Sequence, residues 1–240
     1  MNASPLHGRV AVVTGGGSGI GLAIASSLAR RGVRCALLGR RAEAVESAAG
    51  SLVTPGLGIP TDVTDTTRVH DALRRVHGHL GPVDIVVHAA GVFHKAPVGE
   101  LTATHWQEVL AVNLTAPVFL TQALWPDLVA QSGQILFVGS IAADRAFPAN
   151  SAYAASKGGL ASFARVVAEE GRDHGVRVIT LQPGQTDTPI WGDTAPRPVR
   201  RAMMRAEGVG ALAADLLATD RSVDFEPVTV VPPTDPWEAT

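Results

Sequence analysis

The chain has 240 residues, of which 46% are hydrophobic and 18% are charged. These fractions exclude a disordered chain, because disordered segments are poor in apolar residues and rich in charge. The 20 Lys and Arg residues are balanced by 22 Asp and Glu residues, so the formal charge of −2 provides no basic surface for nucleic acid.

A single cysteine, Cys35, excludes an intrachain disulfide and a zinc site made of several thiolates. It suits a reducing compartment, so we expect a cytoplasmic protein. The first ten residues lack a signal-peptide pattern, and the most apolar stretch, Val109–Pro126, contains polar residues and prolines. We therefore expect no membrane span and no membrane partner.

Short apolar runs alternate with longer segments of helical period along the whole chain. This alternation is typical of an α/β protein in which helices cover both faces of a parallel sheet. The seven expected strands are Arg9–Val13, Arg34–Leu38, Leu52–Ile59, Val83–His88, Gln134–Gly139, Arg177–Leu181 and Pro227–Val231. The expected helices are Gly19–Arg31, Ala42–Ala49, Thr66–His79, Thr104–Ala111, Pro117–Val129, Ala152–His174 and Arg197–Ala218. No repeat or linker divides the chain, so residues 1–240 are predicted to form one domain.

A glycine-rich turn directly follows the first strand and leads into an apolar helix. The turn reads Thr14-Gly15-Gly16-Gly17-Ser18-Gly19-Ile20-Gly21. Glycines let the backbone approach a pyrophosphate closely, and a helix N-terminus offers unpaired N–H groups and the positive end of its dipole. A turn that binds no ligand is the alternative. The residues predicted to bind the phosphates of a dinucleotide are Gly15, Gly17, Ser18, Gly19, Ile20 and Gly21.

Arg40 and Arg41 follow the second strand, where NAD-binding chains carry an acidic residue for the ribose 2′-hydroxyl. Arginine cannot accept a hydrogen bond from a hydroxyl, but its planar fork suits a 2′-phosphate. We therefore expect NADP(H) as the cofactor, with NAD(H) possible. The alternative is that both arginines are only solvated residues at a helix start.

Tyr153 and Lys157 are four residues apart at the start of an expected helix, so both side chains leave the same face. A cation beside a phenol favours the phenolate and lowers the phenol pKa, which makes the tyrosine a workable proton donor and acceptor. An ordinary surface contact is the alternative for such a pair. Ser140, however, lies just after the fifth strand, at the edge where open α/β sheets place their sites.

Together these features resemble the short-chain dehydrogenase/reductase family over nearly the whole chain. The resemblance is carried by the turn Thr14–Gly21, Asp62-Val63, Ala89-Ala90-Gly91, Asn113, Ser140, Tyr153 with Lys157, and Pro183-Gly184 followed by Thr188. It implies a single-domain Rossmann fold with a seven-stranded parallel sheet. It also implies an NADP(H)-linked oxidoreductase of the 3-oxoacyl reductase-like type, acting on a ketone or a secondary alcohol.

The resemblance assigns a role to each catalytic position. Ser140 would polarise the substrate carbonyl, and Tyr153 would protonate its oxygen. Lys157 would bind the nicotinamide ribose and lower the pKa of the tyrosine, while Asn113 would hold a water that links Lys157 to solvent. The cofactor contacts that it implies, besides the glycine turn and the arginines, are Asp62 and Val63 at the adenine, Ala90, Gly91, Tyr153, Lys157, and the turn residues Pro183, Gly184, Thr186 and Thr188 at the nicotinamide.

Each of these residues also has a purely structural interpretation. Asn113 could cap a helix, Asp62 could hold a turn and Ser140 could be a simple hydroxyl cap. His88 stands where the family usually has asparagine, and we interpret it as a buried residue at a strand end. No histidine has convergent partners, so no metal site is assigned.

The resemblance implies that residues 189–210 form a lid over the substrate. An apolar wall is expected from Phe93, Phe147, Ile190, Trp191, Met203 and Met204, with packing in a helix core as the alternative. The Pro-rich stretch Pro227–Pro236 is expected to leave the sheet edge as a tail. The resemblance also implies a homo-oligomer, a dimer or tetramer, that pairs through Pro117–Val129 and Ala152–His174, and apolar faces on both helices would permit this. Two other functions are open: a non-catalytic dinucleotide sensor, which would not need Ser140, Tyr153 and Lys157, and a cofactor-independent lyase, which would not need the glycine turn.

Overall fold

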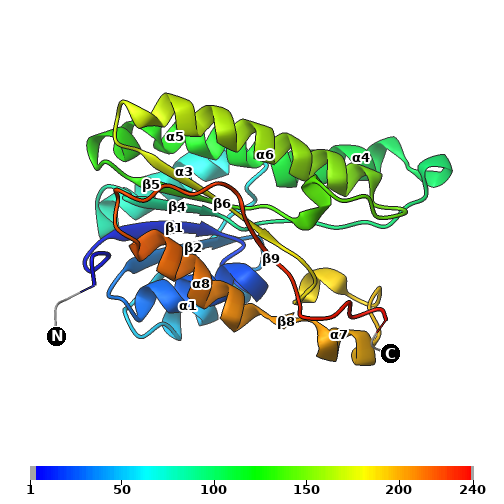
Figure 1. Ribbon diagram of the computed structural model, residues 1–240. Coiled ribbons are helices and arrows are strands. Elements are labelled where there is room, and N and C mark those ends of the chain that lie inside the picture. The colour runs from blue at the N-terminus through cyan, green and yellow to red at the C-terminus, as the bar shows by residue number, and fades with distance from the viewer. Residues whose placement is uncertain (1–3, 239–240) are drawn as a thin grey trace.

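A seven-stranded parallel sheet forms the centre of the computed structural model, which describes residues 4–238 (Figure 1). In sheet order the strands are β3 (Leu57–Pro60), β2 (Arg34–Gly39), β1 (Val10–Thr14), β4 (Ile85–His88), β5 (Gln134–Val138), β6 (Arg177–Pro183) and β9 (Val228–Val230). The chain runs from β1 to β3 in one direction along the sheet and from β4 to β9 in the other. The sheet therefore has a switch point between β1 and β4, where α/β proteins bind ligands.

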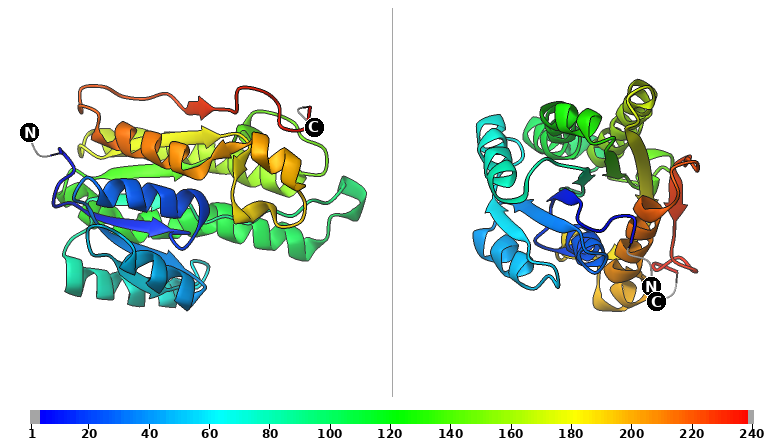
Figure 2. Two further views of the ribbon diagram at one scale, coloured as in Figure 1. Left: turned by 90° about the horizontal axis from the view of Figure 1, so that it is seen from below. Right: turned by 90° about the vertical axis from the view of Figure 1, so that its left-hand side faces the viewer.

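Helices cover both faces of the sheet, as predicted (Figures 1 and 2). The hydrophobic core on one face joins the sheet to α1 (Gly19–Ala29), α2 (Ala42–Gly50) and α8 (Ala206–Ala218). The core on the other face joins it to α3 (Thr66–Leu80), α5 (Ala116–Ala130) and α6 (Ser151–Arg172). All five residues of β1 are buried, which explains why its sequence is a continuous apolar run rather than an alternating one.

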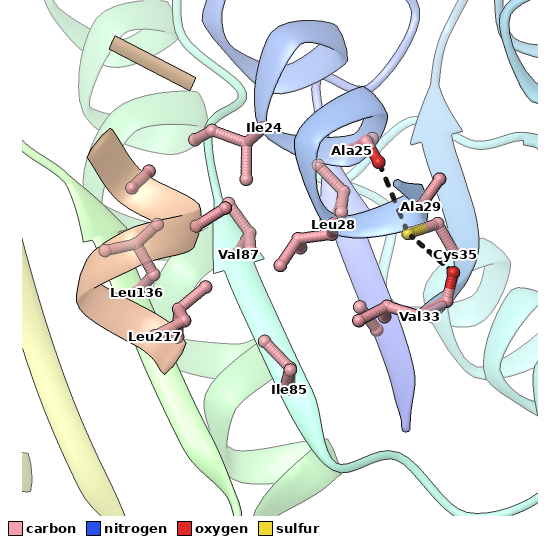
Figure 3. Close-up of a cluster of buried hydrophobic side chains, with 14 of the residues drawn as sticks. Ile24, Ala25, Leu28, Ala29, Val33, Cys35, Ile85, Val87, Leu136 and Leu217 are labelled. Atoms are coloured by element: carbon pink, nitrogen blue, oxygen red, sulfur yellow. Dashed lines mark hydrogen bonds between the residues drawn. The ribbon is translucent and has the colours of Figure 1, made fainter. Parts of the chain in front are cut away.

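The core on the α1 face is built from aliphatic side chains (Figure 3). Leu28 of α1 and Leu217 of α8 lie against Val87 and Leu136 of the central strands. Cys35 is buried in the same core, and this burial raises the pKa of its thiol to about 12. The thiol therefore stays protonated and serves as a small apolar side chain.

The third predicted strand is wrong in its first half. Residues 51–54 form a turn and a bend, and β3 begins only at Leu57. Pro55 cannot donate to a strand ladder, and a Cβ at Gly56 would lie 3.0 Å from the Cys35 carbonyl oxygen. Leu52 is nevertheless buried, because the loop packs it into the core on the α1 face. The apolar residues at the start of this run are therefore a sign of burial in the core and not of a β-strand.

Two helices predicted as separate are one continuous stretch. α4 (Ala103–Leu110) passes through a π-helical turn, η2 (Ala111–Thr115), directly into α5. A π-helical turn departs from the regular backbone ladder, which accommodates Pro117, since proline has no N–H to donate. The π-helical turn contains Asn113, one of the predicted site residues.

This stretch, Ala103–Ala130, is long and apolar enough to cross a membrane when judged by length and composition alone. Leu120, Leu124 and Leu128 are fully buried in the core beneath it. A core helix of a globular domain passes the same test, so the result is weak evidence for a membrane span.

The last predicted helix is interrupted in its first third. α7 (Arg197–Ala202) ends before Met203, and β8 (Met204–Arg205) then pairs in parallel with β7 (Thr186–Asp187) before α8 begins. Met203 has an extended backbone, and its side chain is buried with Ala195 and Val199 in a small core of its own. Residues 4–238 also form three short 3-10 turns: η1 (Val98–Glu100), η3 (Ile141–Ala143) and η4 (Pro189–Trp191).

Candidate active site

A cavity of about 760 Å³ opens at the carboxyl ends of β1, β4, β5 and β6. This is a usual volume for a small-molecule site. The predicted site residues that line it are Gly15, Gly17, Ser18, Gly19, Ile20, Gly21, Arg40, Arg41, Asp62, Val63, Ala90, Gly91, Ser140, Tyr153, Lys157, Pro183, Gly184, Thr186 and Thr188. Asn113 is fully buried and does not line the cavity.

The glycine turn forms one wall of the cavity and leads into α1. Gly15 and Gly19 have φ angles of 66° and 55°, a left-handed region that favours glycine. A Cβ on Gly21 would lie 2.4 Å from the Gly15 carbonyl oxygen, so a side chain there would push the turn apart. The helix then starts at Gly19, and neither a capping side chain nor an acidic residue occupies its first turn. Its free N–H groups and positive dipole end can therefore receive an anion.

Thr14 fixes this turn against the end of β4. Its hydroxyl accepts hydrogen bonds from the backbone N–H groups of Ala89 and Ala90, each at 3.1 Å, and donates to the Val87 carbonyl at 3.3 Å. One side chain thus holds the switch point of the sheet in place. Sequence analysis placed Thr14 in the motif and gave it no role, because this role depends on contacts with residues more than 70 positions away.

Arg40, Arg41 and Asp62 lie at one end of the cavity. Both guanidinium groups are exposed, and neither forms a hydrogen bond or ion pair within residues 4–238. Asp62 accepts hydrogen bonds from the Thr64 hydroxyl (2.7 Å) and the Thr64 N–H (3.0 Å), and these bonds, with a smaller effect of Arg40, lower its pKa. Asp62 therefore does hold a turn, as its structural interpretation proposed, while also facing the cavity.

Ser140, Tyr153 and Lys157 meet at the other end of the cavity. Ser140 follows β5, and its hydroxyl accepts a hydrogen bond from the Ala142 N–H at 3.1 Å. This is the capping role of its structural interpretation, and the same side chain also hydrogen-bonds the Tyr153 phenol. Both Tyr153 and Lys157 come from α6, and the Lys157 ammonium lies 5.7 Å from the centre of the tyrosine ring. The ammonium donates to the Val138 carbonyl at 2.9 Å.

Burial controls the protonation of both α6 residues. It raises the pKa of the Tyr153 phenol above 10.0, and the Ser140 hydrogen bond opposes this in part. It also lowers the pKa of the Lys157 ammonium to about 8. The prediction that Lys157 lowers the pKa of Tyr153, made from their spacing and implied by the family resemblance, is therefore wrong in direction. The phenol accordingly keeps its proton at neutral pH, and Lys157 is mostly charged there.

Asn113 joins the site to the loop after β4. Its Oδ1 accepts from the Val92 N–H at 2.9 Å, and its Nδ2 donates to the Val92 carbonyl at 3.0 Å and to the Ser156 hydroxyl at 3.2 Å. Ser156 in turn donates to the Tyr153 carbonyl at 2.7 Å. The side chain thus ties the loop to the helix that carries Tyr153 and Lys157. That Asn113 holds a water for Lys157 stays a prediction.

The segment after β6 closes the cavity with short, paired pieces of chain. Thr186 and Thr188 are buried, and Thr188 approaches the glycine turn: a Cβ on Gly19 would lie 3.2 Å from it. Arg200 of α7 is 2.6 Å from the Asp187 carboxylate, which fastens α7 to this turn. Arg200 is therefore engaged within the protein rather than directed at an anionic substrate.

The predicted apolar wall is correct for four residues of six. Phe93, Phe147, Ile190 and Trp191 line the cavity, but Met203 and Met204 do not. Met203 is buried in the small core beside α7, and Met204 packs towards the core on the α1 face, because the helix predicted through them is broken.

The prediction that the C-terminal tail leaves the sheet edge is wrong, because Asp235 and Trp237 of the tail line the cavity. Sequence analysis also missed Lys95, Asn150 and Gln185, which line it too. The one sequence signal for the tail is Trp237 itself, a large aromatic in a polar segment.

A nicotinamide dinucleotide fits the residues present. The uncapped helix end suits its pyrophosphate, and the two exposed guanidinium groups suit an additional phosphate. The fitting residues all line one cavity, and Tyr153 lines the same cavity. Among residues 4–238, no group of three or more His, Cys, Asp or Glu side chains is arranged to hold a metal ion.

The chain is similar to known proteins in sequence and in fold. The family model for short chain dehydrogenases matches residues 9–198. A D-threitol dehydrogenase of Mycolicibacterium smegmatis is 39% identical over 74% of this chain and 70% of its own. A gluconate 5-dehydrogenase of Gluconobacter oxydans is 33% identical over 75% of this chain and 72% of its own. The structure of an alcohol dehydrogenase from Thermococcus sibiricus, complexed with 5-hydroxy-NADP, superposes with a TM-score of 0.87 at 27% identity, covering 94% of this chain and 97% of that one.

Proposed function

Because the chain belongs to the short-chain dehydrogenase/reductase family, we propose that this oxidoreductase uses NADP(H) to interconvert a ketone and a secondary alcohol. The single observation that carries the proposal is the meeting of Ser140, Tyr153 and Lys157 at one end of a cavity whose other parts suit a dinucleotide. A hydroxyl, a phenol and an ammonium at one point form a proton-transfer site. The narrower 3-oxoacyl reductase-like activity stays a prediction.

When bound, the dinucleotide supplies or accepts the hydride. The chain's own residues handle the proton and the substrate oxygen. Ser140 donates a hydrogen bond to the carbonyl oxygen, and Tyr153 transfers its phenolic proton to that oxygen as negative charge develops there. Lys157 then stabilises the tyrosinate, because its ammonium lies beside the ring and is mostly charged at neutral pH. Burial keeps the Tyr153 phenol protonated at neutral pH, which is the form that protonates the substrate oxygen in reduction.

Arg40 and Arg41 support NADP(H) over NAD(H). Their guanidinium groups can bind a 2′-phosphate, and neither is engaged by another residue of the described chain. The alcohol dehydrogenase from Thermococcus sibiricus was solved with an NADP derivative, which agrees with this choice. The two other functions have less support: a sensor does not need the Ser140, Tyr153 and Lys157 arrangement, and a cofactor-independent lyase does not need the glycine turn.

The test is the Tyr153→Phe variant, assayed for NADPH oxidation with a panel of ketones. We expect turnover to fall by about 10²–10⁴-fold, because general acid catalysis contributes on this order. NADPH affinity, followed by fluorescence, is expected to stay nearly unchanged. Unchanged turnover would refute Tyr153 as the acid. In the wild-type protein kcat/KM is expected to be higher with NADPH than with NADH, and a clear preference for NADH would refute the cofactor assignment.

A further inference from the structure

The C-terminal tail, residues 231–238, returns to the substrate end of the cavity instead of leaving the sheet. β9 pairs with the end of β6, where Val230 is the partner of Pro183, and the Gly184 N–H donates to the Val230 carbonyl at 2.7 Å. The tail therefore starts beside the turn that closes the cavity. Figures 1 and 2 show its end near α7. The tail lies outside residues 9–198, the segment that the family model matches.

The tail is held in a defined conformation by its own residues. Pro232 and Pro236 are buried, and proline restricts the backbone at both positions. The Asp235 carboxylate accepts a hydrogen bond from the Trp237 N–H at 2.9 Å, and the Asp235 carbonyl accepts from the Glu238 N–H at 3.1 Å. The resulting turn presents Trp237 to the cavity.

Trp237 completes a row of aromatic rings that begins at the proposed acid. Phe93 lies 5.1 Å from the Tyr153 ring and 5.7 Å from the Trp191 ring, and Trp191 lies 6.5 Å from the Trp237 ring, all measured between ring centres. All three pairs are edge-to-face, the arrangement that aromatic rings prefer. The Lys95 ammonium, 5.2 Å from the indole centre, holds the far end of the row.

The row of aromatic rings and the neighbouring Ile190 form an apolar wall of the cavity that the protein itself covers only in part. The side chains of Trp237 and Ile190 are 41% and 38% exposed although both line the cavity, so a ligand with an apolar group can cover them. Lys95 and Asp235 carry opposite charges at the same rim, which favours neither an anionic nor a cationic substrate. The chemistry therefore suits an uncharged group with a flat apolar surface.

We propose that Trp237 is a specificity-determining residue, and that with Phe93 and Trp191 it selects carbonyl substrates that carry an aromatic ring next to the reacting carbon. The inference rests on the proposed function, because it places the reacting carbonyl at Tyr153. The substrate class is thus an aryl ketone, or the corresponding secondary alcohol, rather than a small polyol.

The experiment compares two ketones that differ only in one group: 2-hydroxyacetophenone, with a phenyl, and hydroxyacetone, with a methyl. We expect the wild-type protein to prefer the phenyl ketone. Trp237→Ala should lower kcat/KM for the phenyl ketone about tenfold, mainly through KM, and change the value for hydroxyacetone less than about twofold. Trp237→Phe should restore most of the loss, because it keeps an aromatic face. Trp106→Ala is the matched control, since this indole is similarly exposed (37%) but lies outside the cavity.

An equal loss on both ketones, or no loss on the phenyl ketone, would overturn the inference while leaving the proposed function intact. If the wild-type protein reduces neither these two ketones nor any ketone of the panel with either cofactor, the proposed function is contradicted instead. Binding then decides the inference: 1-phenylethane-1,2-diol is titrated into the protein in the presence of NADP⁺. The inference is supported if Trp237→Ala binds the diol at least about fivefold more weakly than wild type does. It is overturned if the two proteins bind the diol equally well, or if wild type does not bind it.

Discussion

At the scale of single residues, His88 shows how a buried side chain links structure to pH. It ends β4, stacks on Phe137 with ring centres 4.8 Å apart, and places its Nε2 2.9 Å from the Thr121 hydroxyl oxygen. Only 3% of the residue is exposed, and its Nδ1 has no partner among the described residues. Burial lowers the pKa of the imidazole to about 3, so it is neutral in the folded protein. Its interpretation as a buried residue at a strand end is confirmed.

His88 should make the protein less stable in mild acid. The unfolded chain takes up a proton on this histidine below pH ~6.5, whereas the folded protein does not do so until about pH 3. The stability that the neutral imidazole contributes is thus present above pH ~6.5 and is lost as the pH falls. Between pH 7.5 and 5 we expect wild type to lose about 2 kcal/mol more unfolding free energy than His88→Asn, measured by urea denaturation. Parallel curves for the two proteins would contradict this.

The sequence predicted where the proposed catalytic residues lie better than it predicted their electrostatics. Spacing on one helix and position at a strand end were enough to bring Tyr153, Lys157 and Ser140 to one cavity. The pKa of Tyr153 depends on how deeply the folded chain buries it, which spacing does not encode. The contact between Trp237 and Trp191 joins residues 46 positions apart and depends on the path of the tail, so no local pattern predicted it.

At the scale of elements, two glycines of α8 occupy very different surroundings. A Cβ on Gly210 would lie 2.5–2.8 Å from three atoms of Ala23 in α1, including its backbone. A Cβ on Gly208 in the same helix would meet nothing within 4 Å. Gly210 therefore sets the close packing of α1 against α8, and through α1 it supports the glycine turn, while Gly208 does not.

We expect Gly210→Ala to destabilise the protein by about 1–3 kcal/mol, because the added methyl overpacks a helix contact. Gly208→Ala should be neutral or stabilising by about 0.5–1 kcal/mol, since alanine is the better helix former. Thermal unfolding followed by circular dichroism measures both. The same melting temperature for the two variants would show that the α1–α8 contact is not as close as described.

Sequence patterns predicted best the elements that carry one clear pattern, such as a glycine-rich turn before an apolar helix or a continuous apolar run. The glycine turn and α1, and the fully buried β1, match their predictions within two residues. The predicted strand at Leu52 and the predicted helix through Met203 were wrong because both residues are buried by packing in irregular segments. The continuity of α4 and α5 was missed because the π-helical turn spans only five residues, too few to show a period in the sequence.

At the scale of the whole molecule, two large apolar side chains are exposed on the helical layer formed by α5 and α6. Phe119 of α5 is 48% exposed and Val166 of α6 is 54% exposed. Figure 1 shows both helices on the same face of the sheet. A second copy of the chain could cover this surface, which agrees with the predicted homo-oligomer.

Light scattering should accordingly give a mass of two or four times 24.9 kDa for wild type. The double variant Phe119→Glu with Val166→Glu should shift the mass to that of the monomer, because four or more charges would be buried at the contact. Val53→Glu, at a side chain 73% exposed beyond α2, is the control and should leave the mass unchanged. A wild-type protein that is monomeric at micromolar concentration would contradict the prediction.

The central claim is that hydride transfer takes place beside the Tyr153 phenol. The most direct measurement uses NADPH deuterated at both C4 positions, with a ketone that the wild-type protein reduces, and follows the label by NMR. We expect one deuterium on the carbinol carbon of the alcohol from wild type. From Tyr153→Phe we expect almost no labelled alcohol, although this variant should still bind NADPH. Alcohol formed without deuterium at that carbon, or equal labelling by both proteins, would contradict the claim.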